Sequence, residues 1–206
     1  MTHLQIVFLQ LAAKFSDDEN LKTALWAGLE KHYSSRKRHY HNLTYLENMI
    51  AELGEVRKQI GNFDVILFSV FFHDVIYKAT AADNEEKSAA FAVSWLRKLS
   101  VENHFIDAVA AQILATKKHE KSADRDTNYL LDADLAVLGK DWETYRLYAT
   151  QIRKEYAVYP DFMYKPGRKK VLLHFLTFPE IYKTDEFKSK YELQARKNLA
   201  METESL

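Results

Sequence analysis

Residues that interrupt helices are scarce in this chain. Only 5 Gly and 3 Pro occur among its 206 residues. Apolar residues recur at helical spacing along most of the sequence, and no segment shows the strict alternation of a half-buried strand. These features predict long helices joined by short connections. We therefore expect an all-α protein.

The helical periodicity divides the chain into about ten segments, with no repeat or linker between them. The predicted helices cover residues 3–15, 18–33, 40–60, 63–77, 84–99, 102–118, 127–139, 142–158, 162–178 and 186–203. Gly61 and Gly139 are predicted C-caps because each follows an apolar periodic segment. Ser100 and Thr184 are predicted N-caps. A chain of this length can fill one core, so we expect a single-domain helical bundle over residues 1–206.

The composition excludes several classes of function. Twenty-nine basic and 29 acidic residues cancel, so we expect neither broad nucleic-acid binding nor attraction to a membrane surface. The absence of Cys excludes disulfides, thiolate zinc sites, Cys-ligated iron–sulfur clusters and Cys nucleophiles. Any bound metal would therefore need nitrogen and oxygen ligands. The oligomeric state is left open.

The apolar segments are short. The longest run, Val65–Phe72, falls well below the roughly 20 residues that span a bilayer. The segment Met1–Leu4 does not begin a basic region followed by an apolar core, as a signal peptide would. We therefore expect a soluble cytoplasmic protein.

Adjacent His73 and Asp74 follow that apolar run directly, and Val75 and Ile76 continue it. A segment that is apolar on every helix face is expected to be buried. Burying an imidazole and a carboxylate costs free energy unless something pairs with them. A metal ion would provide such a partner, since both side chains are good ligands.

A further candidate ligand comes from the segment Leu130–Leu138. In a helical projection, Asp134 lies roughly 20° from the centre of the apolar face, whereas Asp132 points roughly 140° away. The periodicity therefore predicts that Asp134 is the buried acid that needs a partner. Asp132 is expected either to be solvated or to accept a hydrogen bond from a ligand His.

The upstream His ligand is not decided by periodicity. His39 would share the apolar stripe of the following helix if that helix already included it, whereas His41 would not. Residues at the start of a helix need not follow the stripe, so both histidines stay open. Two His and two Asp would form a nitrogen–oxygen set that suits Mn, Mg, Fe, Zn or Ni. Such a set leaves open positions for water and a substrate oxygen.

At these residues the sequence resembles the HD-domain metal-dependent phosphohydrolases, whose pattern is H…HD…D on a bundle of helices. The matching residues are His41, His73, Asp74 and Asp134. The chain is more closely similar to a bacterial subfamily of HD proteins of about this length. The similar segments are Arg38–Leu43, Phe72–Tyr77, Asp83–Ala89, Asp132–Gly139 and Glu192–Leu199.

The resemblance favours His41 over His39, because the family pattern places its first ligand at the start of this helix. It implies an HD-type bundle that holds a divalent metal ion and hydrolyses a nucleotide or another small phosphoester through a metal-activated water. Tyr45 departs from the pattern, since relatives often carry a His near that position. Two alternatives stay open. One is a non-catalytic, metal-stapled module that binds a nucleotide or a partner protein. The other is an HD-type di-iron oxygenase, which needs additional His ligands.

Two further residues are candidates for proton transfer. Glu85 begins the helix after the HD pair, and it is either a general acid/base or an acidic residue that complements the helix dipole. His119 ends a predicted helix, and it either serves the metal or substrate or is a surface His favoured near a helix C-terminus.

Basic and aromatic side chains supply the candidates for substrate binding. Arg38 is the first choice because it is close in sequence to His41, and Arg suits bidentate phosphate recognition. Arg153 and Tyr156 are the second choice, because their segment resembles a family segment. The run Arg168–Lys170 is interpreted as a solvated stretch of helix and is left out of the site.

Overall fold

The all-helical architecture is confirmed. The structure is a computed structural model that describes residues 1–206. It contains ten α-helices and two short 3-10 helices, and no strand. Two compact units divide the chain, Met1–Leu130 and Leu131–Leu206. The single domain over residues 1–206 stays a prediction beside this division. No helix combines the length and the apolarity needed to cross a membrane.

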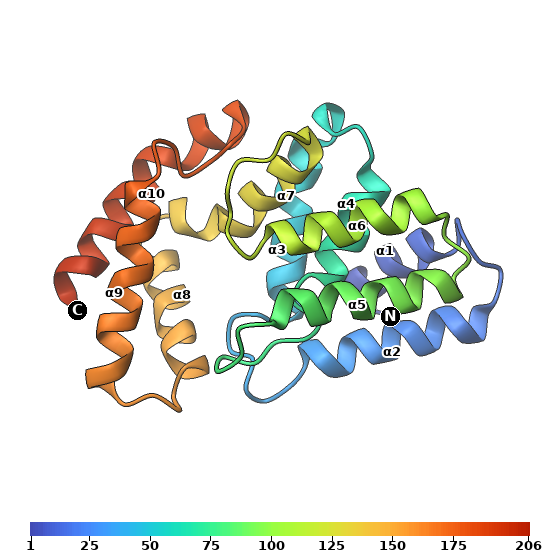
Figure 1. The fold of residues 1–206 in the computed structure, drawn as a ribbon, viewed down its shortest axis with the longest axis horizontal. Helices are drawn as coiled ribbons and strands as arrows, with labels where there is room; N and C mark the ends of the chain where they lie inside the picture. The colour runs from blue at the N-terminus through green and yellow to red at the C-terminus, as the bar shows by residue number, and fades with distance from the viewer. The chain divides into compact units, whose positions relative to one another are not determined.

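The first unit is built around one buried helix (Figure 1). Its helices are α1 (His3–Ala12), α2 (Glu19–Tyr33), α3 (Leu43–Glu55), α4 (Phe63–Phe72), α5 (Asn84–Lys98), α6 (Asn103–Ala115) and most of α7 (Arg125–Leu135), with a 3-10 turn at Arg57–Gln59. Helix α4 packs against α1, α3, α5 and α6. Eight of its ten residues are buried, as expected for a helix that is apolar on every face.

Helix α4 is shorter than its predicted range of 63–77. It begins after Asn62, whose side chain accepts a hydrogen bond from the backbone of Val65, and it ends at Phe72. His73 is the C-cap, and the chain then turns toward α5. There the Ser88 hydroxyl bonds both backbone groups of Ile76. The His73–Asp74 pair therefore lies in the turn that leaves the core helix, not within the helix.

The structure confirms one of the four predicted caps and places the other three, Ser100, Gly61 and Gly139, differently. Thr184 is the N-cap of α10 (Asp185–Ser205), as predicted. Ser100 is not an N-cap: it adopts a left-handed conformation with φ 61° and follows the last turn of α5. Gly61 donates its backbone N–H to Asp126 and does not cap α3, which ends at Glu55. A residue type that is common at helix ends does not by itself show that the residue caps a helix.

The second unit holds the last residues of α7, a 3-10 turn at Ala136–Gly139, α8 (Trp142–Glu155), α9 (Asp161–Thr177) and α10. Helix α10 packs against α9 and against the 3-10 turn. Gly139 permits that approach, because a Cβ there would lie 2.4 Å from the Cβ of Tyr191. Its predicted role as a C-cap is therefore replaced by close packing.

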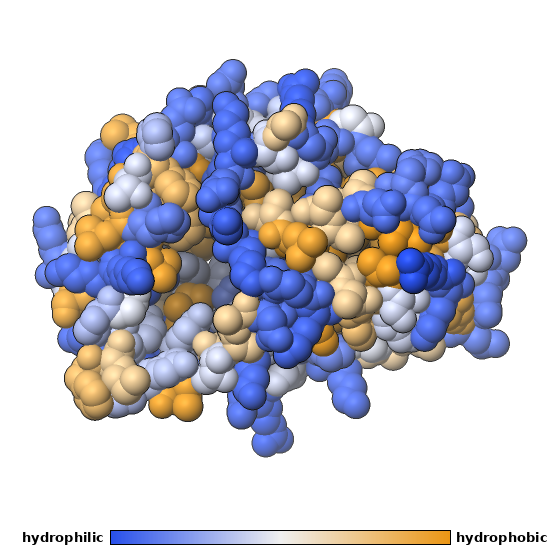
Figure 2. All heavy atoms as spheres, in the orientation of Figure 1, coloured by the Kyte–Doolittle hydropathy of each residue, from blue (hydrophilic) through white to orange (hydrophobic).

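A buried ion pair stabilises the contact between α9 and α10. The Nε and Nη2 atoms of Arg168 lie 2.8 and 2.9 Å from the two carboxylate oxygens of Glu202. The hydroxyl of Tyr145 also donates to Glu202. The interpretation of Arg168 as part of a solvated stretch is wrong, because α10 covers that face of α9. Elsewhere, hydrophobic and hydrophilic residues are interspersed over the face in Figure 2.

Candidate metal centre

Three of the four predicted ligands converge within the first unit. The Nε2 atom of His73 lies 3.5 Å from a carboxylate oxygen of Asp74, and the Nε2 atom of His41 lies 3.8 Å from the same oxygen. The side chain of His73 is 1 % exposed, and those of His41 and Asp74 are 18 % and 17 % exposed. These three residues form the histidine–aspartate cluster. Its arrangement combines a buried ring with two groups that still reach solvent.

The loop before α3 places His41, and not His39, beside Asp74. Asn42 is the N-cap of α3, and its side chain joins the backbone N–H of Tyr45 to the carbonyl of His39. His39 is exposed on this loop, whereas His41 faces Asp74. Periodicity could not separate the two histidines, because both precede the first helical residue, Leu43.

Hydrogen bonds fix the ring of His73. Its Nδ1 atom lies 2.9 Å from the carbonyl oxygen of Val70, which can only accept. In the neutral ring, Nδ1 therefore carries the proton and Nε2 keeps its lone pair. That lone pair accepts a hydrogen bond from the hydroxyl of Tyr45, 3.0 Å away. A carbonyl bound to the far nitrogen is the arrangement that orients metal-binding histidines.

Aromatic rings surround His41. The ring of Tyr77 lies 4.4 Å from the His41 ring, centroid to centroid, at an angle of 33°. The rings of Tyr40 and Tyr45 approach it edge-on at 5.0 and 5.5 Å. Such packing restricts the imidazole to few orientations and lowers the entropy lost when it binds a ligand. The sequence patterns assigned no packing role to these rings, although Tyr45 lies four positions after His41.

Arg38 connects the two segments that carry the cluster. Its Nη1 atom donates to the carbonyls of His41 and Asp74 at 3.2 and 2.7 Å, and its Nη2 atom donates to Val75 at 2.8 Å. The guanidinium also lies over the ring of Tyr33, 4.7 Å from its centroid. We predicted Arg38 as a substrate-binding residue. Its observed contacts position the backbone beside two predicted ligands, and substrate binding stays a prediction.

The side chains of the cluster suit a divalent cation in their chemistry, but their spacing in the structure does not form a metal site. In a tetrahedral site with bonds of about 2.0–2.1 Å, the donor atoms lie roughly 3.3–3.4 Å apart. The observed separations of 3.5 and 3.8 Å are slightly longer, and no group of three or more His, Asp or Glu side chains is already arranged as a metal site. Binding would require these side chains to move closer together and the Tyr45 hydroxyl to leave His73.

The two acids of the segment Asp132–Asp134 exchange the environments that we predicted. Asp132, expected to point away from the core, is fully buried. Its carboxylate accepts hydrogen bonds from the backbone N–H groups of Lys183 and Thr184 and from the Thr184 hydroxyl, at 2.7–3.0 Å. Asp134, expected to be the buried acid, is half-buried near the end of α7 in the second unit. The helical projection was wrong because the segment before α10 covers the polar side of α7.

Asp132 therefore has a structural role in the second unit. Burial raises the pKa of its carboxyl, and the hydrogen bonds from Thr184 and Lys183 oppose that shift. Burial lowers the pKa of Lys183, and the charges of Asp132, Asp134 and Glu192 oppose it. The role of Asp134 as a metal ligand stays a prediction.

Of the two candidates for proton transfer, Glu85 lies on α5, which follows the loop after the cluster, and His119 lies after α6. Glu85 is half-buried in the first turn of α5, where its charge contributes to the raised pKa of Lys117. Lys117 bonds mainly to Glu86 and also donates to the carbonyl of Ala82. His119 follows α6 in a left-handed conformation with φ 52°, as a residue that ends a helix often does. Roles for Glu85 and His119 in the reaction stay predictions.

Arg153 and Tyr156 lie at the end of α8 in the second unit. Arg153 donates to the carbonyls of Tyr156 and Tyr159 at 3.0 Å, and it pairs with Asp161 at 2.8 Å. Its guanidinium also lies 4.5 Å from the ring centroid of Tyr164. These contacts hold the turn between α8 and α9. Substrate binding by Arg153 and Tyr156 stays a prediction.

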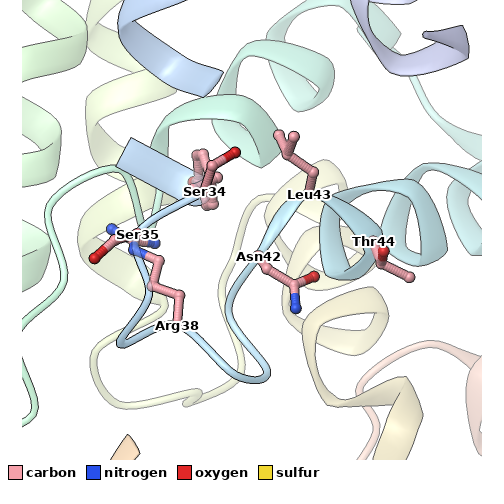
Figure 3. A pocket seen from close by; sticks show the side chains of 7 residues that line it. Ser34, Ser35, Arg38, Asn42, Leu43 and Thr44 are labelled. Carbon is pink, nitrogen blue, oxygen red and sulfur yellow. The ribbon is translucent and has the colours of Figure 1, made fainter. Parts of the chain in front are cut away.

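A small pocket of about 230 Å³ opens beside Arg38 (Figure 3). Its lining residues are Tyr33, Ser34, Ser35, Arg38, Asn42, Leu43 and Thr44. Figure 3 shows Arg38 on the loop between α2 and α3, with the serines on the α2 side and Thr44 on the α3 side. Most of this lining is polar, and Asn42 follows His41 directly in the chain.

Comparisons with protein-family models, with curated proteins and with solved structures give no match for this chain. The resemblance to the HD-domain phosphohydrolases therefore depends on the motif residues and the similar segments of this sequence, and membership of that family stays a prediction.

Proposed function

We propose that this chain is a metal-dependent phosphohydrolase of the HD type that acts on a nucleotide or another small phosphoester. The histidine–aspartate cluster carries the proposal: two imidazole nitrogens approach one carboxylate oxygen at 3.5 and 3.8 Å. We assign His41, His73, Asp74 and Asp134 as ligands of a divalent Mn, Mg, Fe, Zn or Ni ion. A cation held there supplies a Lewis acid for a phosphoryl oxygen and lowers the pKa of a bound water toward neutrality.

The protein groups around the cluster prepare it for that role. The bond from Nδ1 of His73 to Val70 leaves Nε2 as the ring nitrogen whose lone pair can bind an ion. The bonds from Arg38 hold the carbonyls of His41 and Asp74, so the two ligand-bearing segments keep one spacing. Rigid placement of this kind lowers the cost of assembling a reactive arrangement.

The substrate site is proposed to include the pocket beside Arg38. Pockets for drug-sized ligands usually measure about 300–1,000 Å³, so a pocket of about 230 Å³ would hold only part of a nucleotide. Any free N–H of Arg38 at the pocket wall would bind a phosphate oxygen. We propose that Glu85 and His119 exchange protons with the attacking water or the leaving oxygen.

A screen of metals against phosphoesters tests this function. Metal-free protein is incubated with Mn, Mg, Co, Ni or Zn and with nitrophenyl phosphate, its diester and a set of nucleotides. We expect hydrolysis that depends on the identity of the metal and is abolished in Asp74→Ala while the helical circular dichroism is retained. Turnover by Asp74→Ala at the parent rate would contradict the proposal.

A non-catalytic, metal-stapled module is the second proposal. The observation that favours it is that the cluster joins two separate segments, one before α3 and one after α4. An ion there would cross-link them, and its removal would then cost stability rather than turnover. Strong metal-dependent melting, together with inactivity toward every substrate and metal, would favour the module over the hydrolase.

A further inference from the structure

Tyr45 occupies the position in which the buried ring of His73 would bind an ion. Its hydroxyl lies 3.0 Å from Nε2 of His73, and the side chains of both residues are almost fully buried. Because Val70 accepts the proton on Nδ1, Nε2 can only be the acceptor in the neutral ring. An imidazole nitrogen has one lone pair in the plane of the ring. It therefore cannot accept this hydrogen bond and bind a cation at the same time.

We propose that Tyr45 is a positioning residue that competes with the metal ion for His73. In the metal-free protein its hydroxyl satisfies the buried nitrogen, which would otherwise lack a partner. When an ion binds, the hydroxyl must leave Nε2, so the lost hydrogen bond subtracts from the metal affinity. This proposal rests on the proposed metal site.

The surroundings of Tyr45 support a defined movement of the side chain. The residue lies in the first turn of α3, three positions after the N-cap Asn42, and its ring packs against His41 and His73. The ring is therefore held near both histidines of the cluster. Rotation about χ1 of Tyr45 would move the hydroxyl away from Nε2, whereas a flip of the ring about its own axis would not, because the oxygen lies on that axis.

Metal affinity of the Tyr45→Phe variant tests the proposal. The substitution keeps the ring and removes the competing hydroxyl. A net hydrogen bond of ordinary strength corresponds to roughly two- to tenfold in an equilibrium constant, so the variant should bind Mn²⁺ or Co²⁺ about that much more tightly by calorimetry. Its metal-free form should melt at a lower temperature, because Nε2 of His73 loses its partner.

The matched control is Tyr145→Phe. Tyr145 is also a buried tyrosine whose hydroxyl donates a hydrogen bond, but to Glu202 in the second unit. We expect this variant to lose stability without any change in metal affinity. An equal gain in affinity in both variants, or an unchanged or weaker affinity in Tyr45→Phe, would overturn the role of Tyr45.

Nitrogen NMR of the parent protein gives a test that does not depend on any variant. In the metal-free protein, His73 should carry its proton on Nδ1 and show a hydrogen-bonded Nε2. Adding Zn²⁺ should shift Nε2 and release the Tyr45 hydroxyl proton to fast exchange. A hydroxyl signal that persists while Zn²⁺ binds at His73 would refute the competition. If the parent binds no metal, the proposed metal site fails as well, which separates that outcome from a failure of Tyr45 alone.

Discussion

The buried carboxylate of Glu202 in the second unit and the half-buried carboxylate of Asp74 in the first unit differ in the hydrogen bonds that their neighbours provide. In the second unit, Glu202 accepts two bonds from Arg168 and a third from Tyr145. In the first unit, the Nε2 atoms of His73 and His41 lie 3.5 and 3.8 Å from a carboxylate oxygen of Asp74, which is longer than an ordinary hydrogen bond.

That difference separates structural polar groups from groups that can take a ligand. A buried charge with a complete set of partners contributes to a single packing arrangement, and a further ligand would have to displace one of those partners. The carboxylate of Asp74 and the rings of His41 and His73 face one another at distances longer than a direct hydrogen bond, so an ion would bind without displacing a bond between them. The first arrangement predicts effects on stability, and the second predicts effects on binding.

The largest effect is expected for Asp74→Asn. Loss of the charged ligand should weaken binding of Mn²⁺ or Zn²⁺ by more than about 100-fold, because the effect should exceed the loss of a group that only orients a ligand. Isothermal titration calorimetry measures it. Asp64→Asn is the matched control, since Asp64 lies at the other end of α4 and pairs with Lys14 on the surface. If Asp74→Asn and the parent bind the metal ion with equal affinity, Asp74 is not a ligand and does not differ in role from the structural carboxylates of the second unit.

Arg168→Met should lower the free energy of unfolding by about 3–5 kcal/mol, because it leaves Glu202 buried without its cation. Urea unfolding measures this change. The double variant Arg168→Met with Glu202→Leu should recover most of the loss, since no unpaired charge is left. We expect metal binding by either folded variant to match the parent. If Arg168→Met alone is as stable as the parent, the ion pair has no structural role.

Arg38→Met should affect stability and binding together. Three hydrogen bonds to carbonyls are lost, two of them beside predicted ligands. We expect metal affinity to fall by roughly 10–100-fold, the range for groups that orient ligands. Arg36→Met, in the same loop but exposed, should leave the affinity unchanged. An effect of equal size in both variants would indicate general electrostatics instead of positioning.

The smallest effect concerns His32, a histidine of the first unit outside the cluster. Burial, helped by the charges of Arg38 and Lys31, lowers its pKa below the usual 6.5. The unfolded chain therefore binds a proton more readily, and the corresponding stability is present above pH 6.5 and lost as the pH falls through the lowered pKa. His32→Gln should unfold in urea with a weaker dependence on acid pH than the parent. A steeper dependence in the variant would contradict the assignment.

The sequence predicted the ten helices because their patterns are local. Scarce breakers and apolar periodicity describe one helix at a time, and all ten appear near their predicted ranges. The predictions failed where distant segments meet. Asp132 is covered by residues about fifty positions later, and Arg168 is covered by Glu202. After His73 and Asp74, the backbone of Ile76 bonds to Ser88 of α5 instead of continuing helix α4. No projection of a single helix contains those partners.

For the candidate site as well, the features set by local sequence were predicted and those set by distant contacts were not. The apolar run predicted that His73 would be buried, and the structure places it at 1 % exposure. The choice between His39 and His41 depends on how the loop before α3 turns, which no periodic pattern describes. The bond from Tyr45 to His73 joins the first turn of one helix to the end of another. Its only sequence signal is a tyrosine on the apolar face of α3, one turn after His41.

The most direct test of the account is proton NMR of the histidine rings during addition of Mn²⁺. A paramagnetic ion broadens signals steeply with proximity, so the histidine–aspartate cluster should be detected at substoichiometric ion. We predict that the signals of His41 and His73 broaden first and that those of the exposed His3 and His104 stay sharp. Broadening of the exposed histidines first, or no broadening of His41 and His73 at one equivalent of Mn²⁺, would contradict the account.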